Sequence, residues 1–261
     1  MTIQESYRLI LIFISIGLTQ TTLENLILSI RFPSVNNYRL GNSSLTHPSV
    51  RWLRFAFDRP GIWFLCILRF LLATTMLIMS FLGNVPWFLP FASIFLELMV
   101  LQRYSYFPCS EVPLQRAALV ALGCHLFFQD SDISLLGLIF IAFQLIIAYA
   151  AAGWHKVKST AWKNGDSMTI FFWRYTGKKH HKFLKKHERY WKWIGWLVIT
   201  FELSFFLALT GDSVTVAFLS IGFIFHASLS VGAGINFFFW TFVGCYPAII
   251  YLGERINIYL F

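Results

Sequence analysis

Apolar segments that approach or exceed the length of a membrane span recur from one end of this sequence to the other. A transmembrane helix needs about 20 predominantly apolar residues, and in lipid the backbone must satisfy its hydrogen bonds internally. Only 13% of the residues are charged, about half the fraction of a soluble domain. We expect an all-α protein, a polytopic integral membrane bundle of about eight transmembrane helices. The segments cover residues 7–30, 61–82, 85–102, 114–128, 133–152, 194–209, 214–231 and 235–252.

The basic residues are distributed as membrane topology would place them. The net charge is +9, and eleven of the 21 lysines and arginines lie between Lys156 and Lys192. Loops that are acidic or uncharged alternate with basic loops at 31–60, 103–116 and 154–193. Because positively charged loops stay in the cytoplasm, the pattern predicts cytoplasmic basic loops, with both termini outside if the first segment spans. It favours an integral membrane location over a nucleic-acid partner.

Segment 178–193 alternates cations with large apolar side chains. This pattern suits a helix that lies in the headgroup layer and binds membrane lipids. Docking of an acidic peptide is the functional alternative. Its histidines have no carboxylate or cysteine at ligand spacing, and the four cysteines of the chain are scattered, so no metal is predicted.

Ionisable residues inside the apolar segments are costly in lipid and are therefore candidates for function. They are Arg69, Glu97, His125, Glu202 and His226. Glu202 lies within its span or, if that helix begins nearer residue 196, at the interface. His226 lies deep in the following span, where its ring can hydrogen-bond a ligand, Glu202 or a backbone carbonyl. A functional and a structural role both stay open for it.

The end of the apolar segment 133–152 carries an unusual group of polar residues. A lysine kept away from water there can act as a base or a nucleophile near neutral pH. Lys156 can instead extend its ammonium group to the interface, as expected for Lys158 and Lys163, and charge alone favours this second reading. The group reads Gly153-Trp154-His155-Lys156-Val157-Lys158, with Ala161-Trp162-Lys163-Asn164-Gly165 after it.

Four groups of residues resemble those of one family of membrane proteins. The first is Asp58-Arg59-Pro60-Gly61-Ile62 with Leu68-Arg69-Phe70-Leu71. The second is Leu98-Met99-Val100-Leu101-Gln102-Arg103 with Leu114-Gln115-Arg116 and Phe127-Phe128-Gln129-Asp130. The third is Tyr149-Ala150-Ala151-Ala152-Gly153-Trp154-His155-Lys156-Val157 with Trp162, Gly165, Ser167 and Met168, and the fourth is Phe225-His226 with Phe237. Together they resemble the horizontally transferred transmembrane domain family, to which the vitamin K-dependent gamma-glutamyl carboxylase belongs.

The resemblance divides the chain into three parts. Residues 55–252 form the membrane core, which includes the basic interfacial segment 154–193. Residues 1–54 form an added N-terminal helix and a basic polar loop, and residues 253–261 form a short tail. Four polar residues weaken the N-terminal segment as a span, namely Thr19, Gln20, Glu24 and Asn25.

The resemblance also implies a chemistry. In the carboxylase, the lysine of the third group is the proposed base that deprotonates reduced vitamin K. By position, this implies Lys156 as the base and His226 as the catalytic group that orients the substrate. It further implies a reduced quinone as the cofactor, with the residues that bind it being His155, Trp162, Glu202 and Arg69.

The implied role is the modification or maturation of a secreted peptide. Small bacterial members of the family mature toxin peptides beside a partner subunit, which implies a peptide substrate, a partner subunit and a bacterial plasma membrane. The chain departs from the carboxylase at Cys109-Ser110-Glu111-Val112-Pro113, where Asn-Gly-Gly-Asp is usual, and has no counterpart of its large extracytoplasmic region. Two readings therefore remain, a carboxylase-like lyase or oxidoreductase and a non-catalytic accessory, export or immunity partner for a peptide.

Overall fold

The predicted all-α class is confirmed in the part of the chain that the structure describes. The computed structural model describes residues 1–31, 59–104, 111–167, 170, 188–233 and 236–260, and these contain helices and turns but no strand. A long helix lies at each of the eight predicted positions. These helices are α1 (Ile3–Arg31), α3 (Arg59–Leu82), α4 (Phe88–Tyr104), α5 (Glu111–Phe128), α6 (Ser131–Lys158), α10 (Glu188–Ser204), α11 (Asp212–Ala233) and α12 (Asn236–Leu260).

Six of these helices are long and apolar enough to cross a membrane, so the predicted count of about eight spans is not confirmed. The six candidate spans lie in α1, α3, α6, α11 and α12, and in α10 together with the 3-10 helix η4 (Phe205–Leu209). The apolar parts of α4 and α5 are shorter, at Phe88–Val100 and Val112–Phe128. Each of the two carries one charged residue of a pair, since Glu97 is buried in α4 and Arg116 is partly buried in α5.

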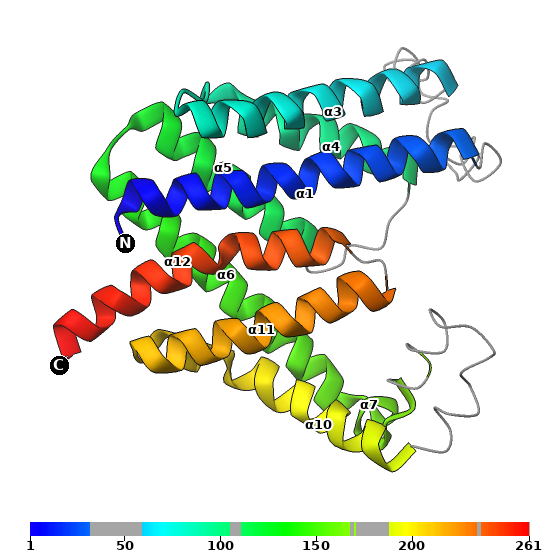
Figure 1. Cartoon of the computed structure of the whole chain (residues 1–261), viewed down its shortest axis with the longest axis vertical. Helices are drawn as coiled ribbons and strands as arrows, with labels where there is room; N and C mark the ends of the chain where they lie inside the picture. Colours follow the sequence, from blue (N-terminus) through cyan, green and yellow to red (C-terminus); the bar gives the residue numbers. More distant parts are fainter. Residues whose placement is uncertain (32–58, 105–110, 168–169, 171–187, 234–235, 261) are drawn as a thin grey trace, which may run out of the picture.

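Consecutive long helices run in opposite directions, and their ends gather at two ends of the bundle (Figure 1). The start of α1 and the end of α12 lie at the same end. There the N-terminal ammonium of Met1 lies 2.6 Å from the Glu254 carboxylate. Short α7 (Thr160–Asn164) lies at the opposite end, after the end of α6. The first and last described helices therefore begin and end, respectively, at the same end of the bundle.

The N-terminal helix is part of the core. Tyr7, Ile10, Ile14 and Leu18 of α1 are almost completely buried in the main hydrophobic cluster. The predicted division of the chain at 54/55 lies outside the described residues and stays a prediction. At the other end, α12 continues to Leu260 through most of the predicted tail.

The polar residues of α1 are paired across helices. Glu24 accepts hydrogen bonds from the Gln20 amide at 3.0 Å and from the Asn236 amide at 2.7 Å. Trp240 donates to the Gln20 carbonyl at 2.6 Å, and Ser230 donates to Asn236. Because these polar side chains form hydrogen bonds with one another, they join α1 to α11 and α12, although they weaken α1 as a span.

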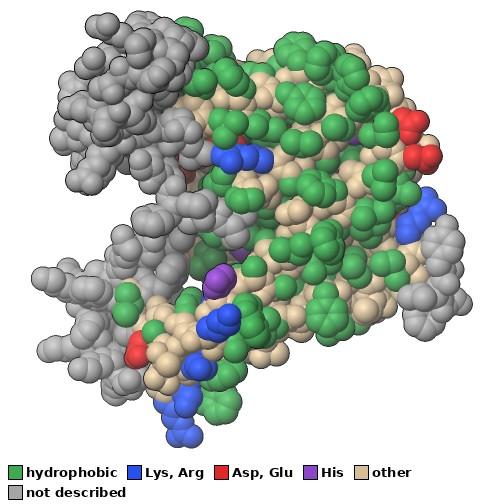
Figure 2. Space-filling view, turned by 180° about the vertical axis from the view of Figure 1, so that it is seen from behind, with side chains coloured by type: hydrophobic (Ala, Val, Ile, Leu, Met, Phe, Trp, Pro, Cys, Tyr) green, Lys and Arg blue, Asp and Glu red, His purple; other side chains and the backbone are tan. Residues whose placement is uncertain are grey.

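The outer surface of the bundle is apolar. Large side chains such as Leu82, Phe81, Phe143, Leu197 and Ile224 are more than half exposed. Hydrophobic side chains cover most of the described surface in Figure 2. An exposed apolar surface of this extent is expected when lipid rather than water is the solvent. The chain is an integral membrane protein.

We predict that Gly17→Ala destabilises the bundle by about 1–3 kcal/mol. A Cβ at Gly17 would lie 2.6 Å from the Trp240 Cβ, so α1 and α12 would have to separate. The test is the thermal unfolding midpoint of the purified protein in detergent. Gly232→Ala is the matched control, because nothing lies within 4 Å of its added Cβ. Equal midpoints for the two variants would contradict a close α1–α12 contact.

Candidate functional site

The helix that carries Lys156 is longer than its apolar run predicts. Asp130 caps α6 by accepting hydrogen bonds from the backbone N–H groups of Asp132 and Ile133. The helix continues past residue 152 to Lys158, so Lys156 lies within its last turn. A cation is favourable there, because the carbonyl oxygens of a helix point toward its C-terminus and give that end a partial negative charge. Tyr149 lies seven residues earlier, which places it on the same face two turns away.

Lys156 forms an ion pair with Glu202 of α10. Its ammonium lies 2.6 and 2.7 Å from the two carboxylate oxygens. The side chain of Lys156 is 16% exposed and that of Glu202 is 4% exposed. The ammonium also lies 5.0 Å from the centre of the Trp162 ring. Lys156 is therefore directed at a buried partner instead of extending away to the interface, and Glu202 is an interior residue.

Gly153 permits this pairing by letting α6 and α10 approach closely. A Cβ there would lie 2.9 Å from Leu203 Cγ and 3.1 Å from Glu202 Cβ. Gly153 is three residues before Lys156, on the same face of α6. The absence of a side chain at this position brings the Glu202 backbone within reach of the lysine.

His226 of α11 belongs to a buried group of polar aromatic residues. Its Nε2 lies 2.8 Å from the Tyr149 hydroxyl, which lies 3.1 Å from the Tyr246 hydroxyl of α12. The His226 ring stacks on Phe242 with centroids 4.4 Å apart, and His226 is only 1% exposed. Of the partners that the sequence left open, Glu202 does not bond His226. The His226 Nδ1 atom is buried without a partner among the described residues.

The ion pair and the aromatic group form one polar region. Phe201, the residue before Glu202 on α10, packs against Tyr149 with ring centroids 5.6 Å apart. Tyr149 in turn lies on the same face of α6 as Lys156. Gly222 of α11 contributes by leaving space, because a Cβ there would lie 2.3 Å from the Tyr246 hydroxyl. The candidate site thus combines residues from α6, α10, α11 and α12.

The structure brings together only part of the predicted site. Trp162, which follows Lys156 in the third group of the resemblance, lies beside the Lys156 ammonium. His155, the residue before Lys156, is exposed. Arg69 lies elsewhere, buried on α3. Arg116 forms an ion pair with Glu97 at 3.4 Å, and the Nε of Arg69 has no partner among the described residues. Segment 171–187, with most of the basic interfacial stretch, lies outside the described residues.

Two site residues were missed from the sequence. Tyr149 had a usable signal, because its seven-residue spacing from Lys156 places both on one helix face. Tyr246 had none, since only the packing of α12 against α6 and α11 brings its hydroxyl to Tyr149. Apolar helices contain many tyrosines, and local sequence does not distinguish a paired one.

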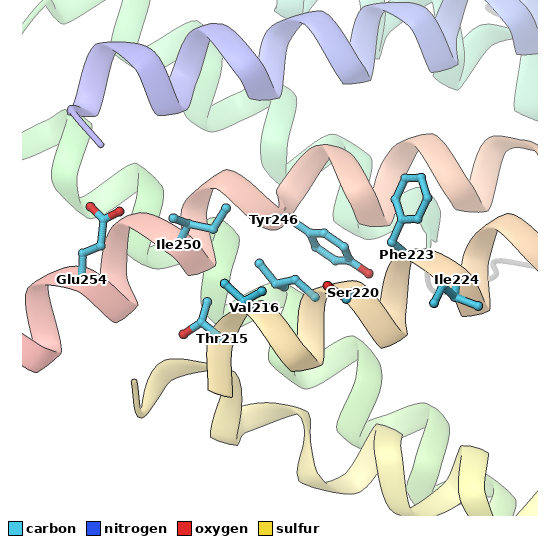
Figure 3. Close-up of a pocket in the computed structure, with 9 residues that line it drawn as sticks. Thr215, Val216, Ser220, Phe223, Ile224, Tyr246, Ile250 and Glu254 are labelled. Carbon is cyan, nitrogen blue, oxygen red and sulfur yellow. The ribbon is translucent and has the colours of Figure 1, made fainter. Parts of the chain in front are cut away.

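The described residues give no support for a metal or a quinone at Lys156. They contain no group of three His, Cys, Asp or Glu side chains that could hold a metal ion. A groove of about 590 Å³ between α11 and α12 reaches the site only through Tyr246, which projects toward Ser220 in Figure 3. Lys156, Glu202 and His226 do not line this groove. We therefore assign no chemical step to a quinone beside Lys156.

Comparisons with protein-family models, curated proteins and solved structures give no match for this chain.

We predict that Lys156→Met and Glu202→Leu each destabilise the protein by about 3–5 kcal/mol, because each leaves one buried charge without its partner. The double variant Lys156→Met/Glu202→Leu should lose much less stability than the two single effects added together. Thermal unfolding midpoints of the four proteins in detergent give the coupling between the residues. Lys158→Met, which removes an exposed neighbouring cation, should unfold like the wild type. Additive losses would show that the pair does not form in solution.

Proposed function

We propose that this protein acts in the modification or maturation of a secreted peptide, with Lys156 and Glu202 as its working pair. The observation that carries the proposal is the ion pair itself, two nearly buried charges 2.6 Å apart in candidate membrane spans. Charged groups at such positions are rare in membrane helices and most often serve a substrate or proton pathway. The peptide substrate comes from the family resemblance.

The pair supports acid–base chemistry. A proton that moves from the Lys156 ammonium to the Glu202 carboxylate converts two charges into a neutral amine and a neutral acid. The amine can then accept a proton from a substrate, while Glu202 keeps the proton it received. Trp162 covers the ammonium from one side, which restricts the approach of water and substrate to the remaining sides. Lys156 is the proposed base.

His226 has a positioning role in this proposal. Its hydrogen bond to Tyr149 and its stack on Phe242 hold the ring in one orientation. Tyr149 lies on the same face of α6 as Lys156, so His226 and Tyr246 together set the rotation of that face. The unpaired Nδ1 of His226 is left to bond a substrate group.

The remaining parts of the proposal rest on the resemblance and on charge. A partner subunit presents the peptide, the protein lies in a bacterial plasma membrane, and its basic loops face the cytoplasm. The reduced quinone that the resemblance implies has no assigned place beside Lys156.

A non-catalytic accessory role is the second candidate, and one observation favours it. The two Glu202 oxygens and the Lys156 ammonium already satisfy each other. A complete pair of this kind can act solely as a clamp between α6 and α10. The protein would then carry or dock a peptide without altering it.

The experiment that separates these roles compares peptide masses in cells. Cells without the gene, with the wild type, with Lys156→Met/Glu202→Leu and with the control Lys158→Met are analysed by mass spectrometry of secreted and membrane-bound peptides. We expect a peptide mass change that requires the wild type or Lys158→Met and disappears in the double variant, whose paired design preserves the fold. A mass gain equal to one CO2 would indicate carboxylation.

The opposite result has a defined meaning. If the double variant accumulates normally and the peptide still matures with an unchanged mass pattern, Lys156 and Glu202 are a clamp. The accessory role then replaces the catalytic one.

A further inference from the structure

A second cavity, of about 510 Å³, lies at the end of the bundle opposite Lys156. It is formed where α1 begins and where α3 and α5 end, at the end that also holds the chain termini (Figure 1). The proposed function does not use this cavity. An inference about it therefore stands independently of the Lys156 site.

On both α1 and α5, the residues that line this cavity change from polar to apolar in the same direction. Gln4, Arg8 and Leu11 of α1 line it, as do Leu122 and His125 of α5 and Gln129, the residue after α5 ends. The helical members of each set follow a spacing of three or four residues, which places them on one helix face. Polar residues lie toward the helix ends, and leucines lie about 10 Å deeper, at a rise of about 1.5 Å per residue. The cavity thus has polar groups at its mouth, beside the apolar Val85 and Leu126, and leucines at its floor.

His125 is held in one orientation at the wall of the cavity. Its ring stacks on Tyr7 with centroids 4.0 Å apart and planes 4° from parallel. Its Nδ1 lies 2.7 Å from the Ser134 hydroxyl, which donates its own proton to the Asp130 carbonyl. The Ser134 oxygen must therefore accept the Nδ1 hydrogen, an assignment that follows from the network. The other ring nitrogen, Nε2, has no described partner and remains for a ligand.

Arg8 brings a positive charge to the mouth of the cavity. Its guanidinium donates one hydrogen bond, 3.3 Å long, to the Phe81 carbonyl. It forms no ion pair with any carboxylate of the described residues. The residues that line the cavity likewise include this cation and no acid. A guanidinium beside an apolar floor favours an anion as its partner.

We propose that this cavity binds an acidic phospholipid. Arg8 holds the phosphate, with the side-chain amides of Gln4 and Gln129 as further donors. One acyl chain extends along Leu11 and Leu122 toward the middle of the membrane. The shared direction of the polarity gradient on α1 and α5 favours an amphiphile over a small free anion, because only an amphiphile fills both parts of the cavity.

The test is native mass spectrometry of the purified full-length chain in detergent with phosphatidylglycerol and phosphatidylcholine at equal concentrations. The wild type should retain phosphatidylglycerol about tenfold better, the effect of one charge-assisted hydrogen-bonded contact. Arg8→Gln should abolish this preference, and Arg8→Lys should keep most of it. Leu122→Trp, which fills the floor, should reduce retention of the lipid.

The matched control is Arg255→Gln. Arg255 is an exposed cation of α12 near the same end of the bundle, and it lies over Tyr251 outside the cavity. The Arg255→Gln variant should retain the wild-type preference for phosphatidylglycerol. The proposal is overturned if Arg8→Gln binds like the wild type, or if Arg255→Gln loses as much preference as Arg8→Gln. It is also overturned if millimolar inorganic phosphate displaces the phosphatidylglycerol, since the site would then serve a free anion.

Discussion

Two buried carboxylates of this bundle, Glu97 and Glu202, each have a counter-ion on a second helix. In the low dielectric of a membrane interior, a single charge costs several kcal/mol and a pair costs much less. Lys156 of α6 meets Glu202 of α10, and Arg116 of α5 meets Glu97 of α4. Each pair joins two helices at one relative height, so the same contacts that lower this cost also set the register of the bundle.

The two ends of the bundle carry different polar groups. The Lys156–Glu202 pair lies near the end where α6 finishes, and Trp162 covers it from one side. The cavity with Arg8 and His125 lies at the other end and is open to an amphiphile. The proposed proton chemistry needs a protected pair, whereas lipid binding needs an accessible cation. One helical bundle accommodates both because its two ends present different residues.

Two glycines decide how closely the helices of the candidate site approach each other. Gly153 brings the Glu202 backbone toward α6, and Gly222 leaves room for the hydroxyl groups of Tyr149 and Tyr246. The resulting group couples His226 to the face of α6 that carries Lys156. Whether Lys156 acts as a base or as a clamp, its environment depends on these two glycines.

Much of the architecture follows from sequence alone. Long apolar runs separated by charged loops require helices in lipid, because no other open structure satisfies the backbone there. The same pattern identified Lys156, Glu202 and His226 as costly residues. Its count of about eight spans is not confirmed, since the apolar parts of α4 and α5 are shorter than those of the other six helices. It also ended α6 too early, because charged residues in a last turn do not stop a helix.

Only the tertiary structure decided which of these residues meet. Lys156 and Glu202 are separated by 46 positions in the chain, and Tyr149 and His226 by 77. Local sequence does not predict such contacts, because they depend on how the helices are rotated and on close packing at glycines. The sequence determined a membrane bundle with a small set of costly polar residues. Packing determined that Lys156 meets Glu202, that Tyr149 meets His226, and that Arg69 lies apart from them on α3.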